Sequence, residues 1–123
     1  MYNQLTQYKE QAISTMSKGE LIIALFDEAL KNIRHGILLM NQEDYAVSKK
    51  CTEKTKSIFN YLCVALNRNY DVSNNLYKLY TFFNQEIIKA EVRRDPTVLE
   101  GILPLVTDMR ETWVQAEKLI HMK

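Results

Sequence analysis

Apolar side chains recur at the spacing of an α-helix through most of this chain of 123 residues. The pattern covers four stretches of similar length separated by short polar links, and no window alternates at the period of two typical of a strand. Helices joined by short links run antiparallel to their neighbours in sequence. We therefore expect an all-α fold, an antiparallel up-down four-helix bundle over residues 17–123, with helices at 17–40, 43–67, 72–94 and 96–120.

Each expected helix carries one apolar stripe that would face the core of the bundle. Trp113 lies in the last stripe, so we expect its ring to be largely buried. Local signals support the helix starts: Ser17 and Glu20 form a capping box, and Asp95-Pro96 places Pro directly after an N-cap. The four stripes are Ile22, Phe26, Ala29, Ile33 and Ile37; Val47, Cys51, Thr55, Ile58, Leu62 and Leu66; Leu76, Leu79, Tyr80, Phe83, Ile87 and Ala90; and Leu99, Ile102, Val106, Met109, Trp113 and Ile120.

Residues 1–16 form a separate short segment with one apolar helical face, made of Leu5, Tyr8, Ala12 and Met16. A helix of this length is marginally stable alone in water, so it needs a surface on which to dock. We predict an N-terminal arm. It either packs permanently on the bundle or acts as a removable lid over a binding surface.

Composition and charge exclude several classes of protein. Sixteen basic residues balance fifteen acidic ones, so the chain lacks the strong positive field of a nucleic-acid-binding protein. The longest apolar run, Leu21–Phe26, is far too short to span a membrane, and no apolar signal core follows Met1. We expect a cytoplasmic protein in which Cys51 and Cys63 remain free thiols.

The residues that usually carry catalysis do not form a recognisable constellation. The two histidines, His35 and His121, belong to no Glu-x-x-His pair, and the sequence has no glycine-rich phosphate loop. Phosphotransfer at His35 stays open only as a weak alternative, because no lysine follows within two turns. We expect no enzyme activity, no catalytic or metal-binding residues and no cofactor.

Two secondary apolar stripes run beside the core stripes of the middle helices. Tyr77, Thr81, Ile88 and Val92 form one, and Tyr45, Thr52, Phe59 and Cys63 form the other. They either pack against neighbouring helices or leave an exposed groove that receives amphipathic helices of a partner. Together with the arm, these stripes supply the candidate partner-binding residues: Leu5, Tyr8, Tyr45, Phe59, Cys63, Tyr77, Thr81, Ile88 and Val92.

A series of short elements resembles one protein family over nearly the whole chain. Thr15-Met16-Ser17 is followed by Glu20-Leu21-Ile22 and by Leu25-Phe26-Asp27-Glu28-Ala29. The Leu76-x-x-Leu79-Tyr80 element comes next, and then Ala90, Asp95 and the ending Arg110-Glu111-Thr112-Trp113. In order and spacing these elements are similar to the FliS family of flagellar export chaperones.

The resemblance implies a cytoplasmic chaperone of a flagellated bacterium that binds the disordered C-terminal segment of flagellin. Binding would prevent premature polymerisation, and the chaperone would deliver the subunit to the flagellar export gate. It implies no nucleic acid and no membrane insertion. A self-associating helical adaptor without a secretion cargo remains the alternative, in which the secondary stripes form a homo-oligomer interface.

Overall fold

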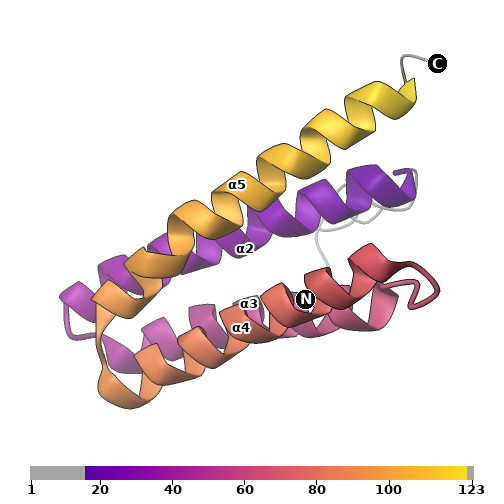
Figure 1. Cartoon of the computed structure of the whole chain (residues 1–123). Coiled ribbons are helices and arrows are strands. Elements are labelled where there is room, and N and C mark those ends of the chain that lie inside the picture. The colour runs from indigo at the N-terminus through magenta and orange to yellow at the C-terminus, as the bar shows by residue number, and fades with distance from the viewer. Residues whose placement is uncertain (1–15, 122–123) are drawn as a thin grey trace, which may run out of the picture.

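The computed structural model describes residues 16–121 of the chain, and within them it contains four helices and no strand (Figure 1). The helices are α2 (Lys18–Asn41), α3 (Tyr45–Ala65), α4 (Asp71–Arg93) and α5 (Pro96–His121). The expected all-α four-helix fold is confirmed, and each predicted range agrees with a helix to within about two residues at either end. No helix of this described part is long and apolar enough to cross a membrane.

Side-chain caps fix the starts of three helices. The Ser17 hydroxyl accepts a hydrogen bond from the Glu20 backbone N–H over 3.2 Å, as the capping box predicts. Asp44 caps α3 in the same way. At α5, Asp95 Oδ1 accepts from the Thr97 N–H over 3.0 Å, which satisfies a donor that the helix itself leaves unpaired. These caps make short, sharp links possible, so consecutive helices fold back on one another.

The helices form a closed ring in which α2 contacts α3 and α5, and α4 contacts the same two helices. In Figure 1, α2 and α5 form one layer and α3 and α4 the other, and the two layers separate toward the end at which α2 begins. This arrangement leaves the outer surface between α3 and α4 uncovered by the rest of residues 16–121.

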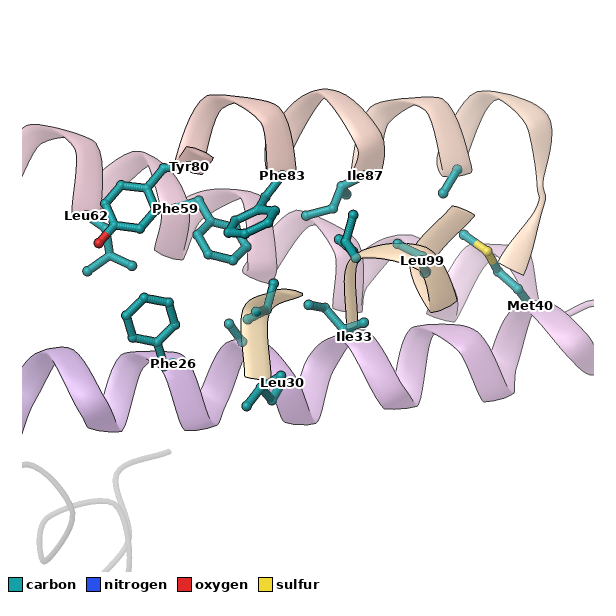
Figure 2. Close-up of a cluster of buried hydrophobic side chains, with 14 residues drawn as sticks. Phe26, Leu30, Ile33, Met40, Phe59, Leu62, Tyr80, Phe83, Ile87 and Leu99 are labelled. Atoms are coloured by element: carbon teal, nitrogen blue, oxygen red, sulfur yellow. The ribbon is translucent and has the colours of Figure 1, made fainter. Parts of the chain in front are cut away.

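An aromatic cluster forms one end of the core, opposite the end at which Met40 lies (Figure 2). Phe59 of α3 lies between two rings of α4, with ring centroids 6.1 Å from Tyr80 and 5.1 Å from Phe83. Phe26 of α2 packs on Tyr80 at 6.3 Å from the other layer. Burying each such ring contributes about 1.5–3 kcal/mol to folding, so this cluster holds the two layers together.

Small residues bring α2 and α3 close together. Ser48 Oγ donates a hydrogen bond to the Gly36 carbonyl oxygen over 3.3 Å, and a Cβ at Gly36 would lie 3.7 Å from both Cys51 Cβ and Thr52 Cγ2. Such close contact buries a face of α3 that includes Ser48 and Thr52, although these residues are polar. As a result, the buried face of α3 is rotated from the predicted stripe, and Val47, expected in the core, is exposed.

The core also ends earlier along the helices than the stripes predicted. Complete burial stops near Phe26 on α2 and Val106 on α5, and beyond them Trp113 is incompletely buried but packs against the core cluster. Leu79 and Ile120 were expected in the core but are exposed, Ile120 to 62%. Ile120 lies at the end where the two layers separate, whereas Leu79 lies beside the buried Tyr80 on an exposed side of α4.

Candidate functional site

The exposed sides of α3 and α4 enclose an open groove of about 770 Å³. Cys63 and Val64 of α3 line one wall, and Tyr77, Thr81 and Ile88 of α4 line the other. Four of these residues belong to the two secondary stripes predicted from the sequence. Ile88 is 48% exposed and Tyr77 is 42% exposed, so the α4 stripe presents apolar surface to solvent.

A second hollow of about 520 Å³ continues the groove toward the start of α3 and the end of α4. Tyr45 and Arg94 lie at its far end, and Val92 lies on its α4 wall. The two hollows share Glu53 and Lys56. We call them the Tyr77 basin and the Tyr45 basin, and together they form the α3–α4 groove.

A polar bridge separates the two basins. Lys56 Nζ lies 2.7 Å from Glu91 Oε1 and 2.8 Å from Glu53 Oε1, and the Thr52 hydroxyl donates to Glu91 Oε2 over 2.6 Å. Burial lowers the pKa of Lys56, but the hydrogen bonds to the two carboxylates outweigh this effect and raise it overall. Lys56 is therefore a fixed cation whose charge the groove itself neutralises.

A second polar contact joins the helices one turn further along. Asn84 Nδ2 of α4 donates to Asn60 Oδ1 over 2.9 Å and to the Lys56 carbonyl oxygen over 3.3 Å. Asn84 Oδ1 is buried and has no hydrogen-bond partner among the described residues. The floor of the groove is thus held by specific polar contacts and has apolar walls at both ends.

The prediction that Phe59 lies on an exposed stripe is wrong. Its ring is 0% exposed, because the contacts of α3 with α2 and α4 turn this part of the helix fully inward. Phe59 contacts Phe83 of α4 inside the core, so it helps to hold together the two helices that form the groove. Leu5 and Tyr8, the candidates on the arm, lie outside the described residues.

The sequence analysis missed a second exposed apolar face on α4. Leu79 and Phe82 are about 40% exposed and lie roughly 120–180° around the helix from Ile88. Leu79 was assigned to the core because it continues the i, i+3 pattern of Leu76. The available signal was that the apolar side chains of α4 cover a wider arc of the helix than contact with one neighbouring helix requires. Periodicity alone does not say which edge of that arc a neighbour covers.

The polar groups outside the groove have structural roles. Glu20, Glu117 and His121 lie close enough to share an ion, but Glu20 and His121 are exposed, and Glu117 Oε1 already accepts a hydrogen bond from Ser17 and contacts His121 Nε2 at 2.9 Å. Such an exposed, internally paired group is ordinary surface chemistry. His35 lies on the exposed side of α2.

Fold and groove together define a class: a small helical bundle that presents an apolar groove between two adjacent helices, of the kind that receives an amphipathic segment of another protein. The family model of the flagellar protein FliS matches residues 1–119. The chain therefore belongs to the FliS family of flagellar secretion chaperones, which is not a family of enzymes.

Individual relatives agree with this assignment. The flagellar secretion chaperone FliS of Bacillus subtilis is 28% identical over 114 residues, covering 93% of this chain and 86% of that protein. Its namesake from Vibrio cholerae is 24% identical over 127 residues, covering 98% and 93%. A crystal structure of a bacterial flagellar chaperone has the same fold, with a TM-score of 0.78 at 21% identity over 93% of this chain and 94% of that one.

Proposed function

We propose that this protein is a cytoplasmic export chaperone that binds the disordered C-terminal segment of flagellin, keeps it from polymerising and delivers it to the flagellar export gate. One observation carries the proposal: the exposed stripe of α4 lines one open groove together with Tyr45 and Cys63, the two ends of the α3 stripe. Flagellin's terminal segment is built to bury apolar faces against other flagellins. An uncovered groove of matching character can bury those faces first, at the cost of ordering the segment.

The binding residues in this proposal are Cys63, Tyr77, Thr81 and Ile88 in one basin and Tyr45 and Val92 in the other. An amphipathic helix along the groove would place apolar side chains in both basins and a polar one over the Lys56–Glu91 bridge. Leu5 and Tyr8 remain proposed contacts or competitors from the arm. The groove needs no chemistry beyond burial, which fits a carrier.

The test is calorimetric titration with a peptide of the flagellin C-terminal segment. Ile88→Asp should weaken binding at least tenfold, since the charge must be desolvated against an apolar partner face. Tyr77→Asp combined with Ile88→Asp should abolish it. Leu105→Asp is the matched control, because Leu105 on α5 is 45% exposed against 48% for Ile88 and lies outside both basins. Unchanged affinity in a folded double variant would place the flagellin site elsewhere.

A thiol footprint tests the location independently. Cys63 lines the groove, whereas Cys51 is buried in the core, so a maleimide reagent should modify Cys63 preferentially. Bound flagellin peptide should protect Cys63, and Cys63→Ser should remove the signal. Equal labelling with and without peptide would contradict binding in the Tyr77 basin.

A self-associating adaptor is the alternative function, and the second exposed face of α4 favours it. Val72, Leu79 and Phe82 are exposed there. The adaptor predicts a stable dimer in solution that ignores flagellin peptide. The chaperone predicts a species whose mass changes by one flagellin segment on titration.

For delivery, we expect an export-gate component to bind the loaded chaperone more tightly than the free one.

A further inference from the structure

An arginine covers a tyrosine ring at each end of the α3–α4 groove. Arg68 Cζ lies 4.5 Å from the centroid of Tyr77, and Arg94 Cζ lies 4.5 Å from the centroid of Tyr45. Both tyrosines line the groove, one in each basin. One tyrosine ring at each end of the groove is thus covered by a positive charge.

Neither arginine has a carboxylate partner within residues 16–121. Arg110, by contrast, makes 2.8 Å contacts with both Asp27 and Glu111. The two carboxylates inside the groove, Glu53 and Glu91, are already paired with Lys56. The middle of the groove therefore holds two carboxylates against one lysine, whereas each end carries an arginine.

The backbone at Arg94 indicates that the side chain there does more than end a helix. Arg94 has φ 52° and ψ 42°, the left-handed conformation that ends many helices and that glycine adopts without cost. An arginine in this conformation gives up stability that glycine would keep. In exchange, the chain gains a guanidinium group over Tyr45 at the mouth of the basin.

Arg68 is positioned at the other end by the loop before α4. Its guanidinium donates to Asn74 Oδ1 over 3.2 Å. Burial raises the pKa of the Cys63 thiol, and the charge of Arg68 opposes that shift. The positive charge therefore acts inside the Tyr77 basin, next to the residues that would contact a partner.

From this geometry we propose that the α3–α4 groove selects an amphipathic helix of about five turns with an acidic side chain near each end. Tyr77 and Arg94 lie 17 positions apart on α4, about 26 Å at 1.5 Å per residue, which sets the helix length. On docking, Arg68 and Arg94 turn from the tyrosine rings to the partner's carboxylates, and the rings pack against its apolar face. This inference rests on the groove being the partner site.

Three synthetic 18-residue peptides with one shared apolar face test the inference, with glutamate, glutamine or lysine at both ends. Fluorescence anisotropy measures their affinities at low and high salt. We expect the glutamate peptide to bind roughly 3- to 15-fold tighter than the glutamine peptide at low salt, and the lysine peptide to bind more weakly than both. The differences should shrink at high salt, because both arginines are at the surface.

Arg68→Gln with Arg94→Gly should abolish the preference for the glutamate peptide over the glutamine peptide. Glycine at position 94 relieves the left-handed backbone, so unfolding does not explain the loss. Lys31→Gln with Arg34→Gln, on the exposed side of α2, removes the same net charge away from the groove and should preserve the preference. Comparing peptides across variants cancels their intrinsic differences in helicity.

Equal affinities of the glutamate and glutamine peptides would overturn the inference, as would a preference that survives in the arginine variant. In either case, a loss of binding in Ile88→Asp would leave the proposed function standing. If Ile88→Asp leaves all three affinities unchanged, the peptides do not bind in the groove and the inference fails. The titration of the wild type with flagellin peptide then decides the proposed function on its own.

Discussion

The Lys56 ammonium group of α3 lies 2.7 Å from the Glu91 carboxylate of α4, and both side chains are less than one-fifth exposed. This pair crosses the floor of the groove and joins the two helices that form its walls. Removing one partner of a partly buried, hydrogen-bonded ion pair costs more than breaking a surface pair, because the other charge is left poorly compensated. It therefore couples the stability of the bundle to the shape of its candidate binding surface.

Glu91→Gln should lower the free energy of unfolding by about 1–2 kcal/mol, since Lys56 is then left with the exposed Glu53 and Thr52 loses an ionised acceptor. Glu86→Gln is the control. Its partner Lys89 is 40% exposed, and that pair is worth less than about 0.5 kcal/mol. Urea unfolding measures both, and equal losses would show that the bridge across the groove adds nothing.

Alkaline pH should weaken the same bridge. Hydrogen bonds to Glu53 and Glu91 outweigh burial and raise the pKa of Lys56. A lysine whose folded-state pKa is raised contributes stability that is complete below its unfolded value of about 10.4 and is lost as the pH rises through the folded value. The unfolding free energy of the wild type should thus fall more steeply above about pH 10 than that of Lys56→Met.

Tyrosine ionisation does not disturb this comparison. Burial raises the pKa of Tyr80 to about 12, with the Trp113 indole N–H opposing the shift, so Tyr80 also costs stability at high pH. That loss is common to both proteins and cancels in their difference. Parallel pH curves would mean that the Lys56 charge interacts no better in the folded chain than in the unfolded one.

Two helix-interior glycines should respond differently to alanine. A Cβ at Gly101 meets no atom within 4 Å, so Gly101→Ala should raise the unfolding free energy by about 0.5–1 kcal/mol through helix propensity alone.

A Cβ at Gly36 meets Leu99 Cδ1 at 3.6 Å, an ordinary contact, so alanine is tolerated there. Gly36→Ile should cost about 1–3 kcal/mol by forcing α3 away. Thermal unfolding of the three variants decides, and a harmless isoleucine would refute the close approach of α2 and α3.

The sequence predicted the order and type of the helices because each helix has apolar side chains at helical spacing. Ser17 and Asp95 also mark the starts of two of them. It predicted the groove in part, since the stripe of Tyr77 and Ile88 is indeed exposed. It failed for α3, where Ser48 and Thr52 are buried although they count as polar. Close contact with Gly36 is a property of two helices together, so no one-helix pattern contains it. The predictions for Leu79 and Ile120 were wrong because periodicity cannot say which side of a helix a neighbour covers, or where that neighbour diverges.

The partial burial of Trp113 changes what its removal should cost. A fully buried tryptophan would predict a loss of 3–5 kcal/mol on truncation. Since Trp113 packs against the core cluster but is not completely buried, Trp113→Ala should cost about 2 kcal/mol. Phe59→Ala, at a fully buried ring, should cost about 3–5 kcal/mol. Denaturant titration of both variants tests the ranking, and a larger loss at Trp113 would contradict it.

The apolar face of residues 1–16 predicts a competition that deletion can measure. If the arm is a lid, it occupies the surface that flagellin needs, and binding must displace it. Deleting residues 1–14 should then raise the affinity for flagellin peptide roughly 5- to 30-fold, which corresponds to about 1–2 kcal/mol of docking free energy. The arm joins α2 at Lys18, at the end of the bundle where the core is incompletely buried.

Single substitutions separate the lid from a direct contact. Leu5→Ala weakens only the docking of the arm, so it should leave the affinity for flagellin equal or higher. Tyr8→Ala should lower it, because a tyrosine presents an apolar ring and a polar tip that a displaced arm can turn toward the partner. Calorimetry measures both affinities, and hydrogen exchange reports the arm itself. If residues 2–14 are equally protected with and without flagellin peptide, the arm is permanent packing and the lid hypothesis is wrong.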